Sequence, residues 1–384
     1  MNPLEEGRRG DAAGTLLIWG IPLFLSVCGV IMITSLSLRN SVTDELYSVS
    51  LKQVRLMGMG MTLMAVCAAI PLHVIRRFSS GLWALSVLLV IGTLIPGVGV
   101  RAGGAQRWLN MGFIFQPLEL LLLTMPIFLA DRLASCERQG FHAFMRPTVL
   151  IAAVSAGPLL LQPNLGGIIL VGAICLLMHV ESRGWTFPLL GGILAAVLVA
   201  LLIWYEPYRM RRFLAFWDPW DDPMGKGFQI IQGLVAFANG GLMGVGIGRG
   251  LQVEQYLPEA QTDYIFSAIG EEFGLMGTLI LLSMYALWTF LAYKIYRRAR
   301  SAFLSSMVMG LTASVVCPMF LNLCGVLKLM PLAGVPLPFL SSGGSSLLFM
   351  WGKIGVLLAV NRAINRSGVR RRLELDSPDF QDAL

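Results

Sequence analysis

The stretch YLPEAQTDYIFSAIGEEFG, residues 256–274, places four carboxylates at the mouth of a long apolar segment that continues to residue 296. The acidic residues are Glu259, Asp263, Glu271 and Glu272. Carboxylates in such a segment cost free energy unless they are paired or carry out chemistry. The stretch therefore predicts a membrane helix with functional or paired acidic groups near one end.

The overall composition is typical of a polytopic membrane protein. Of 384 residues, 56% are hydrophobic and only 13% are charged, which is too apolar for a soluble globular chain of this length. The formal net charge of +7 comes from short clusters of Lys and Arg between apolar runs, as in cytoplasmic membrane loops. No basic face with interleaved aromatic residues is present, so nucleic-acid binding is not expected.

Apolar windows of about 20 residues, the length that crosses a hydrocarbon core, predict an all-α polytopic fold with about ten transmembrane helices. The first seven windows are residues 14–37, 55–75, 81–98, 112–131, 147–162, 165–180 and 187–205. The last three are residues 263–296, 302–325 and 343–364. The fifth and sixth are the least distinct, because only Gln162-Pro163-Asn164 separates them.

The distribution of Lys and Arg between the windows predicts that both termini are cytoplasmic. Residues 1–13 then form the cytoplasmic N-terminus, residues 14–366 a single transmembrane domain, and residues 367–384 a cytoplasmic tail. The tail is polar from Arg370 onward, which predicts disorder. The connection 206–262 between the seventh and eighth helices is expected outside the cell. A structureless connection of that length would be unusual, so we expect short interfacial helices there, with Trp217 and Trp220 at headgroup level.

Asp263 is expected in the first turn of the eighth helix, where the helix dipole favours an anion. Capping of the helix by Thr262 or Asp263 and a catalytic role explain this position equally well. Glu271 and Glu272 lie two turns deeper, with Glu271 near the face of Asp263. They either pair with buried Arg or Lys side chains or line a polar cavity, and we favour the cavity.

Arg101 and Arg107 lie in the glycine-rich connection before the fourth helix, and each supplies an external cation. An Arg pair beside a cavity can hold a phosphate group bidentately. Anchoring in lipid headgroups, with Trp108 at the interface, explains the same residues equally well. Glu119 is expected inside the fourth helix and therefore needs a partner, for which Arg107 is the nearest candidate.

The last outer connection, KLMPLAGVPLPFLSSGGSS (residues 328–346), is rich in Pro, Gly and Ser. This composition predicts a rigid re-entrant turn whose polar groups are satisfied by hydroxyls and water. No His or Asp lies near these serines in the sequence, so a serine hydrolase is not expected. Gly344-Ser345-Ser346 is expected to cap the tenth helix.

At these residues the chain resembles the SEDS family, the RodA and FtsW proteins of shape, elongation, division and sporulation. The matching segments are GGAQRWLNMGFIFQPLEL, QPNLGG, FWDPWDDPMGKGFQIIQ, YLPEAQTDYIFSAIGEEFGLMG and GVPLPFLSSGGSS. They occur in the family's order and together span most of the chain. The forms DPW at Asp218–Trp220 and YLPEAQTD are closer to the division and sporulation branch, so an FtsW-like protein is favoured.

The resemblance implies a peptidoglycan glycosyltransferase of the bacterial cytoplasmic membrane. Such proteins polymerise lipid II on the outer face, release undecaprenyl pyrophosphate, and act with a class B penicillin-binding protein and other divisome or elongasome membrane proteins. Asp263 matches the family's essential aspartate and would act as general base. Arg107, and less directly Arg101, would offset charge on the leaving pyrophosphate. The further substrate-binding candidates are Glu119, Glu259, Glu271, Lys328 and Ser342.

A divalent cation, Mg²⁺ or Mn²⁺, is compatible with this chemistry, although no metal-ligand spacing in the sequence requires it. Four departures from the family pattern concern the substrate site rather than the reaction class. Leu118 replaces a serine, Leu122 a lysine, Asn164 an aspartate, and Lys328 a glycine. Lys328 is the candidate to replace the cation that is missing at position 122.

Two other functions remain open. A bundle with buried Glu119, Glu271 and Glu272 is also compatible with a lipid II flippase or other transporter. An inactive scaffold for division proteins is supported only by the departures from the family pattern. Acids in a column through the bilayer would favour transport, whereas Asp263 at the external membrane surface would favour chemistry on headgroups.

Overall fold

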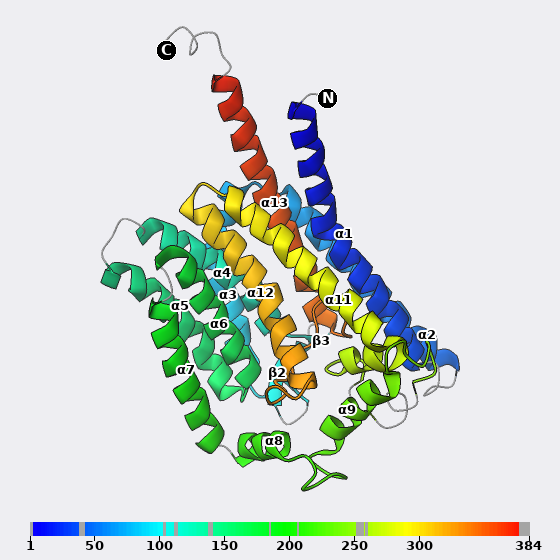
Figure 1. Ribbon diagram of the computed structural model, residues 1–384. Coiled ribbons are helices and arrows are strands. Elements are labelled where there is room, and N and C mark those ends of the chain that lie inside the picture. The colour runs from blue at the N-terminus through cyan, green and yellow to red at the C-terminus, as the bar shows by residue number, and fades with distance from the viewer. Residues whose placement is uncertain are drawn as a thin grey trace.

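The computed structural model is a bundle of long helices, in which α1 begins and α13 ends at the same end (Figure 1). It describes residues 3–37, 43–102, 105–110, 114–136, 141–183, 186–205, 207–250, 257 and 260–375. The first elements are α1 (Pro3–Ser37), α2 (Thr43–Ala69), α3 (Leu72–Gly92), β1 (Gly99–Ala102), β2 (Ala105–Asn110), β3 (Ile114–Phe115), α4 (Pro117–Cys136), α5 (Phe141–Leu161) and α6 (Leu165–Arg183). The others are α7 (Thr186–Tyr205), α8 (Pro207–Trp217), α9 (Phe228–Gly240), α11 (Ile265–Arg298), α12 (Ala302–Val326) and α13 (Gly344–Leu375).

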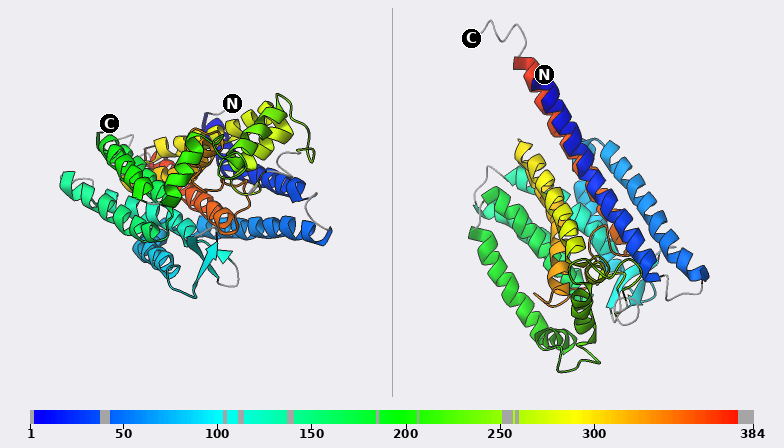
Figure 2. Two further views of the ribbon diagram at one scale, coloured as in Figure 1. Left: turned by 90° about the horizontal axis from the view of Figure 1, so that it is seen from below. Right: turned by 45° about the vertical axis from the view of Figure 1, so that its right-hand side comes forward.

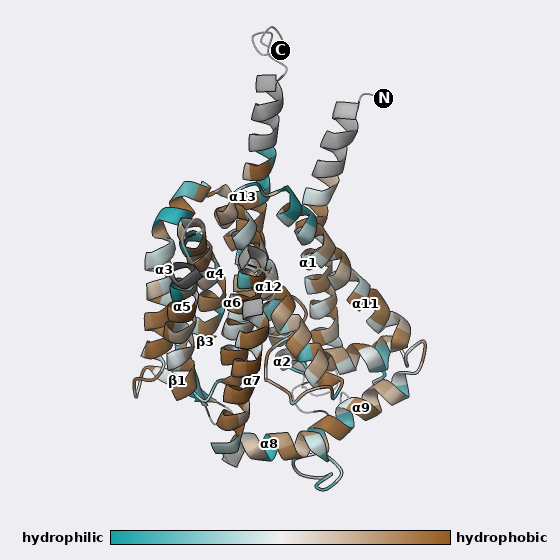
Figure 3. Ribbon diagram, turned by 60° about the vertical axis from the view of Figure 1, so that its left-hand side comes forward, coloured by the Kyte–Doolittle hydropathy of each residue, from teal (hydrophilic) through white to brown (hydrophobic). Residues whose placement is uncertain are grey.

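Each predicted apolar window corresponds to one helix, α1 to α7 or α11 to α13, so the polytopic helical fold is confirmed. Five helices of the described chain are by themselves long and apolar enough to cross a membrane: α1 from Ala13, α3, α11, α12, and α13 as far as Arg366. Shorter apolar helices occur in α5 and α6. Hydrophobic residues run along α7, and hydrophilic residues gather toward the ends of the bundle (Figure 3). The chain is a multi-pass membrane protein.

The break between the second and third helices lies at Pro71 and not at the predicted residues 76–80. Pro lacks the backbone N–H that would continue α2. Pro71 is the N-cap residue of α3, with φ of −62° and an extended ψ of 139°, so the next helix begins at Leu72. Arg76 and Arg77 therefore lie inside α3, near its start, and not in a connecting loop.

A three-stranded antiparallel sheet, in the order β1-β2-β3, precedes α4 and was not predicted. Arg101 on β1 faces Gln106 on β2, with an irregular register beside this pair. The segment is too rich in glycine to show the alternation of a strand, yet its backbone groups are paired in the ladder. Because β3 extends to Phe115, α4 begins five residues later than the predicted window.

The long helix α11 is interrupted at Gly274, where φ is 66° and ψ is −165°. A Cβ at this glycine would lie 2.4 Å from the backbone N of Gly244. The glycine-rich segment 241–246 fills the break with backbone hydrogen bonds. These join Val245 N to Glu271 O, Gly246 N to Glu272 O and Leu275 N to Gly241 O at 2.9–3.0 Å. The segment is therefore a structural insert in a broken helix.

The short helices expected in the long connection are confirmed as α8 and α9. Both lie at the end of the bundle opposite the start of α1 and the end of α13 (Figures 1 and 2). Phe237 of α9 packs edge-on against Phe266 of α11, with ring centroids 5.5 Å apart. Trp217 and Trp220 are 74% and 63% exposed, which leaves them available to headgroups.

The centre of the bundle is formed by α4, α12 and α13, which are buried over most of their membrane-spanning length. α13 also packs closely against α2, since a Cβ on Gly355 would lie 2.4 Å from the Met64 carbonyl. The prediction of disorder from Arg370 is wrong as far as Leu375, because α13 continues to that residue. An established helix extends readily through good helix formers such as Arg and Leu.

Candidate active site

Asp263 lies in the turn formed by residues 260–264, directly before α11 and not in its first turn as predicted. The N-cap residue of α11 is Tyr264, whose side chain makes no capping hydrogen bond. The expectation that Thr262 or Asp263 is the N-cap residue is therefore wrong. Asp263 is half-buried. It directly precedes α11, whose start lies at the end of the bundle that also carries α8 and α9 (Figure 1).

Asn322, near the end of α12, fixes the backbone of this turn. Its Nδ2 atom donates to the carbonyl oxygens of Asp263 and Val335, both at 2.9 Å. The Asn322 side chain is buried, so these hydrogen bonds are shielded from competing water. A single amide thus joins α12, the turn that holds Asp263, and the last outer connection.

Two serines of the last outer connection add further links to the turn. The Oγ atom of Ser341 donates to the Thr262 carbonyl at 2.6 Å and accepts from the backbone N of Leu337 at 2.9 Å. The backbone N of Ser342 donates to the Gln261 carbonyl at 2.8 Å. The predicted re-entrant turn, satisfied by hydroxyls, is thus supported, and its role here is to hold the residues beside Asp263.

The carboxylate of Asp263 faces Gly334, which belongs to the last outer connection. Gly334 has φ of +65°, and a Cβ there would lie 3.8 Å from Asp263 Oδ2. Burial raises the pKa of the neighbouring Tyr264 phenol, the Asp263 carboxylate raises it further, and the Arg212 guanidinium of α8 acts in the opposite direction. Arg212 is therefore a cation on the Asp263 side of the protein. No motif in the sequence indicates this placement.

Arg107 and Arg101 separate in the structure. Nη2 of Arg107 donates to the Pro163 carbonyl at 2.7 Å, which ties β2 to the connection between α5 and α6. Arg101 lies on β1 and is exposed. The start of α6 in turn touches the last outer connection, because a Cβ on Gly166 would lie 2.7 Å from the Ala333 carbonyl. Arg107 and Asp263 thus belong to one end of the bundle and are linked through α6.

Asn164, one of the departures from the family pattern, has a local role. Its Oδ1 atom accepts from the backbone N of Gly167 at 3.1 Å, at the start of α6. Asn and Asp cap helices about equally well. The replacement of an aspartate by Asn164 therefore preserves the start of this helix.

Glu119 does not pair with Arg107 as predicted, and the cation that acts on it is Lys353 of α13. Glu119 and Lys353 are 4% and 1% exposed, and they lie within electrostatic range of each other. Nζ of Lys353 donates to the Ser314 carbonyl at 3.0 Å. Leu122, which stands where the family has a lysine, is buried in the same helix as Glu119. A buried opposite charge from another helix lowers the cost of placing Glu119 in the membrane.

The other predicted residues differ in how far the structure informs them. Lys328 follows α12 with φ of 56°, and its suggested role as a replacement cation stays a prediction. Ser342 contributes its backbone N to the Asp263 turn. Glu259 lies outside the described residues.

Glu271 and Glu272 are both 1% exposed and lie just before the break in α11. Oε1 of Glu272 accepts from Ser35 Oγ of α1 at 2.7 Å and from the backbone N of Gly248 at 3.1 Å. Oε1 of Glu271 lies 3.4 Å from Nδ2 of Asn239. These donors connect the two carboxylates to α1, to α9 and to Gly248, which follows the glycine-rich segment 241–246, so the two residues support the helix break.

The described side chains do not form a site in which the protein alone would hold a metal ion. Across the described ranges, no three His, Cys, Asp or Glu side chains come together as a ligand group. The turn that holds Asp263 is bonded instead to the Asn322 amide and the Ser341 hydroxyl, through the backbone carbonyls of Asp263 and Thr262. Within the part of the chain that the structure describes, Asp263 alone offers an ion too few carboxylate ligands.

The comparisons with known proteins identify the family. The family described as "Cell cycle protein", which comprises FtsW, RodA and SpoVE, matches residues 15–366. The chain belongs to this family. A "Probable peptidoglycan glycosyltransferase FtsW" of Thioalkalivibrio sulfidiphilus is 34% identical over 355 residues, covering 89% of this chain and 88% of that protein. "Stage V sporulation protein E" of Bacillus subtilis is 34% identical over 354 residues, covering 90% of this chain and 96% of the relative.

Solved structures agree with this family assignment. A chain from a structure described as "Structural coordination of polymerization and crosslinking by a peptidoglycan synthase complex" has a TM-score of 0.73 at 28% identity, covering 90% of this chain and 98% of that chain. Thermus thermophilus RodA has a TM-score of 0.67 at 23% identity and covers 90% of this chain and 96% of that one. The second likeness concerns the fold alone.

Proposed function

We propose that this FtsW/RodA/SpoVE family member is a peptidoglycan glycosyltransferase that polymerises lipid II at the outer face of the bacterial cytoplasmic membrane. The activity class is that of the FtsW relatives, which match about nine tenths of the chain. The residues of the site are our own assignment. The observation that carries it is the fixed position of Asp263, whose turn is bonded to α12 and to the last outer connection.

In the proposed reaction, Asp263 acts as general base. Its carboxylate accepts the proton of the acceptor GlcNAc 4-hydroxyl as that oxygen attacks the anomeric carbon of the donor MurNAc. The bond from this carbon to the pyrophosphate breaks, and undecaprenyl pyrophosphate leaves with the electron pair. A carboxylate whose backbone is held at its own carbonyl and at the two preceding carbonyls keeps its orientation toward the acceptor, which lowers the cost of reaching the transition state.

The leaving pyrophosphate requires positive charge near Asp263. Arg107, on the sheet that adjoins α6, is the proposed partner, with Arg101 nearer the water. Arg212 of α8 is a further cation on the same side, and its effect on Tyr264 supports its inclusion. Glu271 is reassigned from substrate binding to support of the helix break.

We propose that the protein acts together with a class B penicillin-binding protein, which supplies the transpeptidase, and with other division or elongation proteins. A peptidoglycan synthase complex among the similar structures supports such a partner. The FtsW and sporulation relatives favour division or sporulation. Both termini are proposed to lie in the cytoplasm, because the end of α11 that carries Lys294, Arg297 and Arg298 lies at their end of the bundle.

The main rival is a lipid II flippase. Purified protein with its transpeptidase partner, supplied with lipid II, is expected to yield glycan strands visible on a gel. Absence of strands, together with passage of lipid II across vesicles that contain the protein, would support transport instead. Neither strands nor transport under conditions where a relative is active would support a scaffold.

A further inference from the structure

A basic pocket lies at the end of the bundle opposite Asp263, where α3 begins and α4 ends. It encloses about 380 Å³. Its lining includes His73, Arg76, Arg77, Ser80, Asp131 and Arg132. Three guanidinium groups against one carboxylate leave the pocket positively charged. None of these residues has a role in the proposed glycan chemistry.

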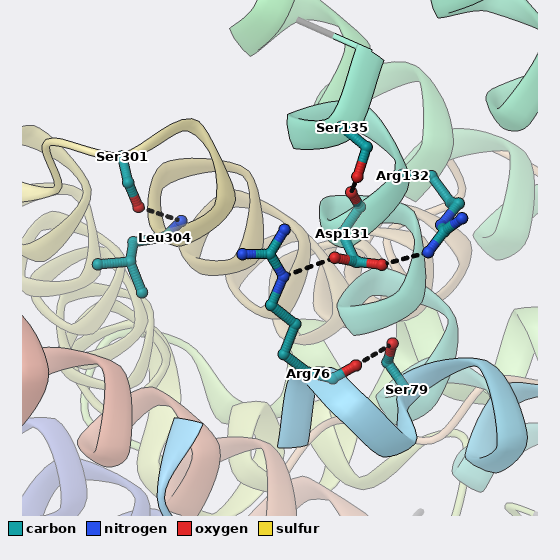
Figure 4. A network of polar contacts seen from close by, with 7 residues as sticks. All are labelled: Arg76, Ser79, Asp131, Arg132, Ser135, Ser301 and Leu304. Atoms are coloured by element: carbon teal, nitrogen blue, oxygen red, sulfur yellow. Dashed lines mark hydrogen bonds and ion pairs between the residues drawn. The ribbon is translucent and has the colours of Figure 1, made fainter. Parts of the chain in front are cut away.

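Two of the three arginines are held in place. Nε of Arg76 and Nη2 of Arg132 each lie 2.6 Å from an oxygen of Asp131 (Figure 4). The Arg76 guanidinium also lies over the Phe303 ring of α12, 4.7 Å from its centroid. Asp131 is therefore occupied by two cations, and its negative charge does not dominate the pocket. The two arginine side chains remain nearly half exposed, at 46% and 48%.

Arg77 is the third arginine of the pocket. The side chain is exposed, and among the residues that the structure describes it takes part in no ion pair. Arg side chains present planar donors that match the oxygens of a phosphate group. A pocket with two fixed guanidinium groups and the exposed one of Arg77 is suited to a phosphate ester.

The surface next to the pocket indicates that the phosphate belongs to a lipid. Four apolar side chains of α3 follow Arg77 at helical spacing and are 41–62% exposed: Phe78, Leu82, Leu85 and Leu88. From Phe78 to Leu88 the helix rises about 15 Å, which is about half of a hydrocarbon core of roughly 30 Å. This stripe is therefore as long as an acyl chain in one leaflet, and it starts beside the pocket.

We propose that the pocket binds the phosphate headgroup of an anionic phospholipid, with an acyl chain along the exposed face of α3. The bound lipid would link α3, α4 and the start of α12, because Arg76, Asp131 and Phe303 come from these three helices. In the proposed orientation the pocket faces the cytoplasmic leaflet, which is the anionic one. The site is independent of the glycosyltransferase reaction.

The test is lipid retention by the purified full chain, measured by native mass spectrometry after exchange into mixed phosphatidylglycerol and phosphatidylcholine. Wild type is expected to retain phosphatidylglycerol preferentially. Arg77→Gln should lower this retention about fivefold, the effect of losing one cation near an anionic headgroup. Arg362→Gln, which removes an exposed charge of α13 near the same end, is the matched control and should retain the lipid.

Each outcome decides the proposal. Equal retention by wild type and Arg77→Gln would overturn the site. In a second experiment, inorganic phosphate, glycerol 1-phosphate or phosphatidylglycerol is added separately, and the melting temperature of the protein is measured. If the two free phosphate compounds raise the melting temperature as much as phosphatidylglycerol does, the pocket binds free phosphate and the lipid assignment is wrong. The melting temperatures of both variants in phosphatidylcholine show whether they are folded. We expect both to fold, because the Arg77 and Arg362 side chains are exposed.

Discussion

The side-chain amide of Asn322 holds the backbone carbonyl of Asp263 at 2.9 Å and bonds at the same distance to Val335. The proposed base is therefore positioned by a residue on another helix, 59 positions along the chain. Each buried acceptor that loses such a donor lowers the free energy of unfolding by about 1–3 kcal/mol. The position of Asp263 thus depends on Asn322 of α12 as well as on α11, the helix that follows it.

Replacement of Asn322 by Leu, which has a similar size and no donor, is expected to lower the rate of glycan polymerisation by at least about tenfold, because a loss near 1.4 kcal/mol in positioning has this effect. The measurement is the initial rate per folded protein. The control is Asn361→Leu, since Asn361 is also buried and bonds to Thr15 and Arg298 near the other end of the bundle. If both variants lose rate only in proportion to stability, Asn322 has no positioning role.

Arg107→Ala is expected to reduce polymerisation more than Arg101→Ala does. Arg107 is anchored by Pro163 beside α6, whereas Arg101 is exposed on β1. Removing a preorganised cation from a developing charge costs about 10²-fold in turnover. The turnover numbers and lipid II concentration dependence of both variants are the measurement. Equal and small effects would favour the headgroup-anchoring explanation of the two arginines.

The buried charges of Glu119 and Lys353, which lie within electrostatic range of each other, predict energetic coupling between α4 and α13. Glu119→Gln and Lys353→Met are each expected to destabilise the protein by about 1–3 kcal/mol, because each removes a charge that offsets the burial of the other. The double variant should recover part of this loss. The measurement is the free energy of unfolding of the wild type, the two single variants and the double variant, each titrated in detergent with a denaturing surfactant. Strictly additive losses would show that the two charges do not interact.

The break in α11 predicts that Gly274 tolerates no side chain. Gly274→Ala would force a Cβ to within 2.4 Å of the Gly244 backbone at a positive φ, so a loss of about 1–3 kcal/mol is expected. Gly172→Ala on α6 is the control, because its Cβ meets nothing within 4 Å. A similar small effect of both changes on thermal stability would contradict the role assigned to the glycine-rich insert.

The sequence predicts the helices well, because apolar windows report directly on the membrane. It does not locate the break at Pro71, because the break depends on a single residue inside an apolar run. It does not reveal the small sheet either, because that sheet depends on backbone pairing in a glycine-rich segment. Asp263 is found from its motif, but Asn322 is a lone polar residue in an apolar helix and looks like any buried amide. Lys353 is likewise visible only as a charge in a membrane helix. Its relation to Glu119 requires the packing of α4 against α13, which no spacing in the sequence reveals.

The most direct test is lipid II polymerisation by wild type, Asp263→Asn and Asp263→Glu, each purified with the transpeptidase partner and checked for equal folding. Asn has nearly the size of Asp, but its neutral amide does not act as a base. Asp263→Asn should therefore lose at least about 10²-fold in rate, the contribution expected of a general base. Asp263→Glu should retain more activity than Asp263→Asn. Glycan strands made by Asp263→Asn at the wild-type rate would contradict the assignment of Asp263 as the base.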